Sequence, residues 1–164
     1  MVEVINDLEH ITAVLPEIHE MGFRDPNLTP RSLEALVEIA AKGDLVLIKI
    51  NNQVVGWGIR EELTKNFKEI GMMFIKPEYR SPSSFIALAR GLANDPCAMV
   101  LATYDQALIR QAVLEFSFRE AGLLEVIIRS RGKFITKRLA RASRKAVKEH
   151  RSQGKALFAI RGKQ

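Results

Sequence analysis

The sequence predicts an α/β protein in which a mixed, mostly antiparallel sheet carries helices on both faces. Apolar residues recur at helical spacing in two segments before residue 43, and the stretch from 45 to 75 has the pattern of three successive strands. A helix then separates these strands from a continuous apolar run at 97–103. The expected order of elements is therefore β-α-α-β-β-β-α-β-α-β-(α)-β.

Length and composition indicate one compact protein. With 164 residues, of which 47% are hydrophobic, we expect residues 1–164 to form a single domain. One cysteine excludes a disulfide framework, and His10 and His19 are too far apart on their helix to predict a metal site. No apolar run reaches the roughly 18 residues that cross a bilayer, and the N-terminus lacks the pattern of a secretory signal. We therefore expect a cytoplasmic protein.

The first half of the chain is expected to hold a strand, two helices and a meander. Residues 2–5 predict an edge strand, and the two helices end at Gly22 and Gly43. The second helix is expected to begin at Thr29-Pro30, since threonine caps helices and proline suits their first turn. Strands are predicted at 45–50, 53–59 and 67–75, with a tight turn at Asn51-Asn52.

The second half is expected to alternate strands and helices. A helix opens at 81–84, and the run at 97–103 predicts a central strand covered on both faces. Asp105 is expected to cap a long helix, with Gly122 just past its end. Further strands are predicted at 124–128 and 156–160.

The formal charge of +6 is unevenly distributed. Residues 1–128 carry 12 Lys and Arg against 18 Asp and Glu, whereas residues 129–164 carry 13 Lys and Arg against Glu149 alone. An anionic partner is therefore expected to bind near the C-terminal end of the sequence.

Residues 133–151 predict an amphipathic helix with one cationic face. That face comprises Lys137, Arg141, Arg144, Lys148 and Arg151. It either is a solvated surface that balances the acidic body or contacts nucleic acid, an acidic protein or an anionic membrane. Since no base-reading motif is present, contact with nucleic acid would be to phosphate.

Residues 69–80, which read EIGMMFIKPEYR, resemble the central strand and following turn of the GCN5-related N-acetyltransferases (GNAT). Ala121-Gly122-Leu123 is similar to the glycine-hydrophobic step before that family's next strand. The resemblance implies the GNAT-like acyl-CoA N-acyltransferase fold, to which this chain adds a basic helix at 133–151 before the last strand. It also implies transfer of an acetyl group from acetyl-CoA to an amine.

The resemblance implies that coenzyme A lies at the turn after this strand. Its pantetheine arm would pair with the backbone of Phe74 and Ile75. Its pyrophosphate would lie at the helix N-terminus, where N–H groups and the helix dipole favour anions. The implied contacts there are Arg80, Ser81, Ser83, Ser84 and Phe85.

The turn departs from the family pattern. Aligned on Arg80, the positions of the family's two small residues are Ser83 and Phe85, and Pro82 removes one N–H donor. The alternative function is therefore a catalytically inactive protein of this fold. Such a protein, for example a virion or nucleoprotein component, would use its basic helix to contact an anionic partner.

The resemblance also suggests catalytic residues. Glu69 stands where one branch of the family keeps a general base, and the alternative is that it is a solvated residue at a strand start. Glu61 and Glu62 are further candidates. Phe118 occupies the place of the family's tyrosine acid, so Tyr104 is the substitute. The amine acceptor and a homo-oligomeric state are left open.

Overall fold

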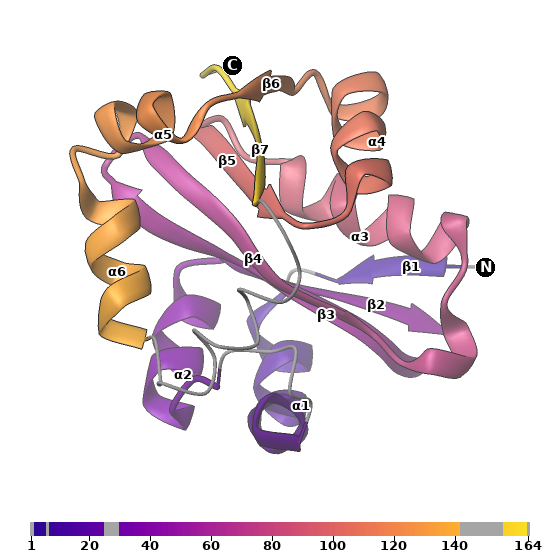
Figure 1. Cartoon of the computed structure of the whole chain (residues 1–164). Helices are drawn as coiled ribbons and strands as arrows, with labels where there is room; N and C mark the ends of the chain where they lie inside the picture. Colours follow the sequence, from indigo (N-terminus) through magenta and orange to yellow (C-terminus); the bar gives the residue numbers. More distant parts are fainter. Residues whose placement is uncertain (1, 6, 25–29, 142–155, 164) are drawn as a thin grey trace. The chain divides into compact units, whose positions relative to one another are not determined.

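The structure is a computed structural model that describes residues 2–5, 7–24, 30–141 and 156–163 (Figure 1). In chain order its elements are β1 (Val2–Ile5), α1 (Leu8–Arg24), α2 (Leu33–Ala41), β2 (Leu45–Ile50), β3 (Gln53–Thr64), β4 (Phe67–Ile75), the 3-10 turn η1 (Pro77–Tyr79), α3 (Pro82–Ala93), β5 (Ala98–Thr103), α4 (Gln106–Phe116), β6 (Arg119–Ala121), α5 (Leu123–Arg129), α6 (Lys133–Arg141) and β7 (Leu157–Arg161).

The described strands follow the order β1-β2-β3-β4-β5-β7-β6 in a mostly antiparallel sheet. The predicted α/β class is therefore confirmed. Helix α6 covers the first part, Lys133–Arg141, of the basic helix expected at 133–151, and the remainder lies outside the described residues. The chain divides into two compact units, residues 1–61 with 70–95 and residues 62–69 with 96–164.

In the first unit, helices cover both faces of the strands, as predicted (Figure 1). One face packs against α1 and α2 through a core that includes Ile11, Leu36 and Trp57. On the other face, α3 approaches so closely that a Cβ atom at Gly58 would lie 2.7 Å from Leu92 Cδ1. Alternate side chains of β3 therefore belong to different helix layers.

A buried arginine ties the end of α3 to the strands of the first unit. Arg60 Nε donates to Asp44 Oδ1 at 3.1 Å, and Arg60 Nη1 donates to the carbonyl of Asn94 at 3.1 Å. The same nitrogen lies 3.6 Å from Asp95 Oδ2. Together with the Gly43 carbonyl, which accepts from Arg60 Nη2, two carboxylates and two carbonyls therefore compensate the desolvated guanidinium.

In the second unit, β7 lies between β5 and β6 and pairs antiparallel with both. Its Ile160 belongs to a core that Val100, Val126 and Phe134 share. The ring of Phe134 also meets Phe158 edge to face, with centroids 5.8 Å apart. Phe134 and Ile135 of α6 thus pack in the core of this unit.

Four sequence-based expectations about elements were wrong. The strand expected at 53–59 continues as β3 to Thr64. Residues 124–128 belong to helix α5, and the strand in this region is the shorter β6. Helix α4 ends at Phe116, because Ser117 adopts a left-handed φ of 58°. Helix α2 is capped by Ser32, whose side chain accepts from Ala35 N, and so begins later than expected.

None of the described helices is long and apolar enough to cross a membrane.

Candidate functional site

The chain leaves β4 through η1 and enters α3 by a turn that its own serines organise. Ser81 is the N-cap of α3, and its Oγ accepts a hydrogen bond from Ser84 N at 3.1 Å. The same oxygen lies 2.9 Å from both Ser83 Oγ and Ser84 Oγ. A serine cap followed by proline is a favourable helix start, which explains why α3 begins here.

Arg80 is directed back onto the strand it follows. Its Nε donates to the carbonyl of Ile75 at 3.0 Å. The two terminal guanidinium nitrogens have no hydrogen-bond partner among the described residues. Arg80 is thus anchored at one atom and presents its remaining donors at an exposed turn, as a phosphate ligand requires.

The backbone donors of this turn are fewer than at a helix start without a cap. Pro82 has no N–H, Ser84 N is bonded to Ser81 Oγ, and Phe85 N donates to the Ser81 carbonyl at 3.0 Å. The N–H of Ser83 therefore remains, beside the terminal nitrogens of Arg80 and the serine hydroxyls. These groups fit a phosphate, with side chains supplying more of the donors than the backbone does.

The strand that leads to this turn has an irregular backbone. Met72, in the middle of β4, has a φ of 46°, which is uncommon for a residue that is not glycine. Beyond it, Phe74 and Ile75 are both buried, so the alternation of inward and outward side chains is interrupted. Phe74 stacks on Trp57 of β3, with ring centroids 5.9 Å apart.

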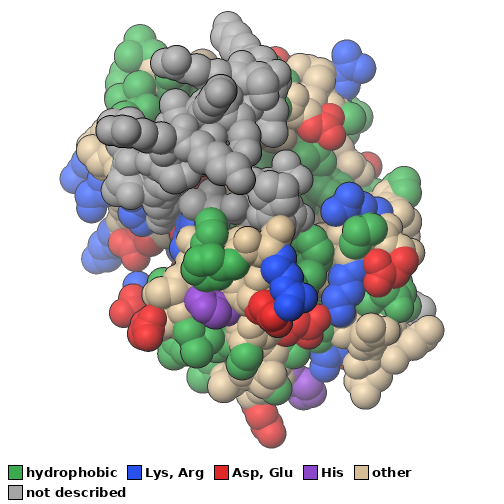
Figure 2. Space-filling view, turned by 60° about the horizontal axis from the view of Figure 1, so that its bottom comes forward, with side chains coloured by type: hydrophobic (Ala, Val, Ile, Leu, Met, Phe, Trp, Pro, Cys, Tyr) green, Lys and Arg blue, Asp and Glu red, His purple; other side chains and the backbone are tan. Residues whose placement is uncertain are grey.

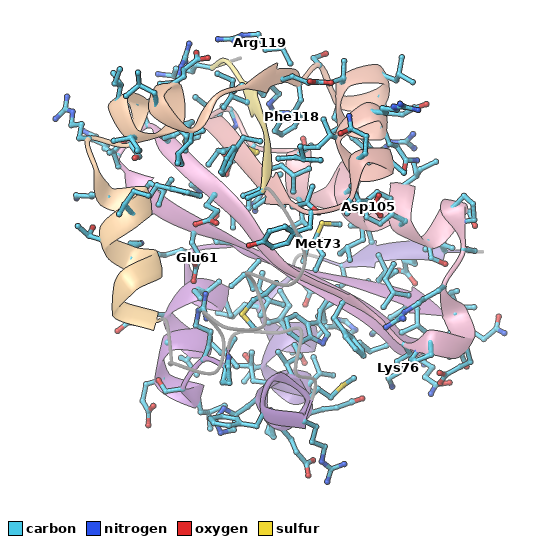
Figure 3. All side chains as sticks on the ribbon, in the orientation of Figure 1. Glu61, Met73, Lys76, Asp105, Phe118 and Arg119 are labelled. Atoms are coloured by element: carbon cyan, nitrogen blue, oxygen red, sulfur yellow. The ribbon has the colours of Figure 1, made fainter. Side chains whose placement is uncertain are left out.

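Glu61 lies on β3, and in Figure 3 it is well separated from Lys76, which follows β4. Its Oε1 accepts from Arg31 Nε at 2.9 Å, and the two side chains are 7% and 10% exposed. The carbonyl of Arg31 lies 2.9 Å from His19 Nδ1, so α1 also contacts this segment. The pairing of Arg31 with Glu61 was not predicted from the sequence. The only signal for Arg31 was its position next to Pro30 at an expected helix start.

Glu69 belongs to β4 in the second unit and is buried, with 5% of the residue exposed. The alternative that it is a solvated residue is therefore wrong. Glu62, in contrast, is exposed on β3.

Tyr104 and Phe118 flank helix α4 in the second unit. Tyr104 follows the last residue of β5, and its side chain is half-buried. The next residue, Asp105, caps α4, because its carboxylate accepts a hydrogen bond from Ala107 N at 2.8 Å. Phe118 follows the helix instead of lying on it, beside the labelled Arg119 of β6 (Figure 3). The guanidinium carbon of Arg161 is 5.7 Å from the centroid of its ring, so this ring is a buried cation–π partner.

The basic helix is described only over Lys133–Arg141. Lys137 Nζ donates to the carbonyl of Glu62, so this member of the predicted cationic face contacts its own unit. The side chain of Arg141 and the whole of Arg144, Lys148 and Arg151 lie outside the described residues.

The structure therefore brings together the predicted turn residues of the first unit, which include Ile75, Arg80, Ser81, Ser83 and Ser84. The predicted catalytic residues Glu69 and Tyr104 belong to the second unit.

Comparisons with solved structures identify the fold. A GCN5-related N-acetyltransferase from Kribbella flavida superposes with a TM-score of 0.56 and 14% identity over 74% of this chain. The chain has the GNAT fold. It spans about a third of that protein's length, since the match covers 34% of it.

Two further structures match the GNAT fold of this chain over nearly their whole length. A Mycobacterium tuberculosis protein in complex with CoA has a TM-score of 0.63 and 14% identity, over 96% of this chain and 97% of its own. A GNAT-family acetyltransferase from Bacillus cereus has a TM-score of 0.54 and 15% identity, over 100% and 99%. No protein-family model matches the sequence, and no curated protein matches it.

Proposed function

We propose that this chain is an acetyl-CoA-dependent N-acyltransferase that transfers an acetyl group to an amine. The observation that carries the proposal is the turn after β4, where Arg80 and the start of α3 offer donors suited to a phosphate. The fold supports it, because a protein with the same fold was solved in complex with CoA. CoA would supply the activated acetyl group as a thioester.

In this proposal the Arg80 guanidinium and the Ser83 N–H hold the pyrophosphate. Ser81, Ser84 and Phe85 form the first turn of α3 and keep these two donors in position. The backbone of Phe74 and Ile75 would pair with the pantetheine arm. The Ile75 carbonyl already accepts from Arg80, so this pairing would share that oxygen or rely on Phe74.

Glu69 is proposed as the general base that removes a proton from the attacking ammonium. The neutral amine then attacks the thioester carbonyl, and the carbon–sulfur bond breaks. The nitrogen releases a second proton as the amide forms, and the leaving thiolate takes one up, for which Tyr104 is the proposed donor. Glu61 is less suited to the role of base, since protonating its carboxylate would break the buried ion pair with Arg31.

A second candidate is favoured by the cap at the turn. Because Ser81 occupies the Ser84 N–H and Pro82 has none, the anion-binding capacity of α3 is reduced. A GNAT-fold binding or assembly protein without catalysis would tolerate this loss. In that case the cationic helix would be the contact for an anionic partner.

Calorimetric titration with acetyl-CoA tests the proposed site. Arg80→Ala should weaken binding by about 1.5–3 kcal/mol, the contribution of a hydrogen bond to a charged group. Arg90→Ala is the matched control, because Arg90 is exposed in the last turn of the same helix. Unchanged affinity in Arg80→Ala would remove this turn from the site, and a parent protein that binds no acetyl-CoA would favour the assembly role.

A further inference from the structure

Helix α5 of the second unit presents aliphatic side chains to solvent. Leu124 and Ile128 are 71% and 67% exposed, and they lie one helical turn apart. Val126, on the opposite side of the helix, is fully buried in the core of the unit. We call Leu124 and Ile128 the α5 apolar face. Because Val126 on the opposite side of α5 already packs in the core, the core of this unit cannot also cover the α5 apolar face.

The surroundings of the α5 apolar face are cationic. Glu125 is the only acidic residue between positions 121 and 148, and it is bound by Arg119 and by Arg129, whose Nε lies 3.0 Å from Glu125 Oε1. Hydrogen bonds from Arg119 first, and from Arg129, hold the pKa of Glu125 below its ordinary value. The carboxylate is therefore ionised and neutralised by its neighbours, while Arg131 and Lys133 remain exposed next to the helix.

Charges on the first unit are arranged differently. Acidic and basic side chains lie side by side on the face shown in Figure 2. Its surface ion pairs include Lys76 with Glu17 at 2.9 Å and Arg24 with Glu20. Exposed aliphatic residues and an excess of cations thus coincide at α5 and at residues 131–151, the basic segment that follows it in the sequence.

We propose that the α5 apolar face, with Arg131 and Lys133, docks onto the surface of an anionic lipid bilayer. Leucine and isoleucine side chains partition into the boundary between headgroups and acyl chains, and neighbouring Lys and Arg residues are attracted to anionic headgroups. Such docking needs no preformed pocket, because the lipids adapt to side chains that project from the helix.

Other partners match these features less well. Nucleic acid attracts the cations but offers phosphate and sugar, not an apolar phase, to Leu124 and Ile128. A second copy of the chain, placed symmetrically on this face, would bring Arg131 and Lys133 close to their own counterparts. A bilayer surface accommodates both the apolar and the cationic component.

Cosedimentation of the full chain with lipid vesicles tests the proposal. One set of vesicles contains phosphatidylcholine alone and the other contains phosphatidylcholine with phosphatidylglycerol. We expect binding to the anionic vesicles, loss of binding as salt rises, and little binding to the neutral vesicles. Absence of binding to the anionic vesicles overturns the proposal.

Substitutions locate the docking surface. The double variant Leu124→Ser/Ile128→Ser should lower the partition coefficient on the order of tenfold or more, because each change removes inserted apolar carbons. Leu114→Ser is the matched control, since Leu114 is 82% exposed but lies on α4, which Figure 1 shows well apart from α5. The control should bind as the parent does.

Arg131→Glu/Lys133→Glu should weaken binding to the anionic vesicles by about fivefold or more per charge. Thermal melting checks that each variant is folded, and size-exclusion chromatography gives its oligomeric state. If the double variant does not fold, the single variants Leu124→Ser and Ile128→Ser are tested in its place. Binding that persists in the serine variants would assign it to the basic segment alone. A change from dimer to monomer in those variants would assign the face to contact between copies. Either result overturns the proposal.

Discussion

At the scale of single residues, two buried ion-pair groups of the first unit are held together by identified partners. Arg60 is held by Asp44 and Asp95, and Arg31 is held by Glu61. Removing one member of such a pair leaves an uncompensated buried charge, which is costly. These residues are therefore expected to tolerate substitution poorly, for reasons of stability that are separate from any role in catalysis.

Glu69→Gln separates these two kinds of role. If Glu69 is the general base, turnover with an amine acceptor should fall by roughly two to four powers of ten, while the affinity for acetyl-CoA stays nearly unchanged. Glu78→Gln, at an exposed residue of η1, is the control. Steady-state kinetics and the titration described above provide the two measurements, and a loss below tenfold would exclude Glu69 as the base.

The sequence could predict residues whose role depends on their immediate neighbours. Asp105 was expected to cap a helix and does so. The ion pair of Arg31 and Glu61 could not be predicted, because the partners are 30 positions apart and meet only when α2 packs on the strands. The cap by Ser81 has a sequence signature, serine before proline. That the cap occupies the Ser84 N–H, and so removes one donor for phosphate, follows only from the hydrogen bonds of the structure.

At the scale of elements, most strands were predicted well, including the short edge strand β1, whereas the segment that follows α4 was not. The strand at 67–75 was predicted with its observed bounds. The run at 124–128 was mistaken for a strand because a five-residue segment with four apolar residues fits a buried strand or a short helix equally well. The ion pair between Glu125 and Arg129, four positions apart, favours the helix over the strand.

The close approach of β3 and its neighbours gives an element-scale prediction. Gly56→Ala should lower the free energy of unfolding by about 1–3 kcal/mol, the usual cost of overpacking, because the new Cβ would lie 2.8 Å from the Phe74 carbonyl oxygen. Gly71→Ala in β4 is the control, since no atom lies within 4 Å of the Cβ position there. Urea denaturation measures both, and equal midpoints would contradict the packing argument.

At the scale of the whole molecule, the fold class followed from the order of elements, whereas the division into two units did not. Residues 62–69 belong to the second unit although β3 and β4 both continue into the first. Nothing in composition marks a boundary there, because the strands are continuous. Only the contacts that each half of these strands makes show the division.

The position of β7 predicts how the second unit responds to a local break. Ala159→Pro should cost about 3 kcal/mol or more, because Ala159 is opposite Leu101 of β5 and Glu120 of β6 and loses its N–H. Lys163→Pro, at an exposed residue after the strand, is the control. Hydrogen exchange should show lost amide protection in both β5 and β6; protection retained in β6 would contradict the central role of β7.

The same strand constrains how the protein is made. As the chain emerges during synthesis, β5 and β6 appear long before β7, which alone joins them. Until residue 161 has left the ribosome, both strands have an unpaired edge, and such edges recruit strands from other molecules. The newly made chain should therefore be most prone to aggregation, and most dependent on chaperones, between the emergence of β6 and the emergence of β7 from the ribosome.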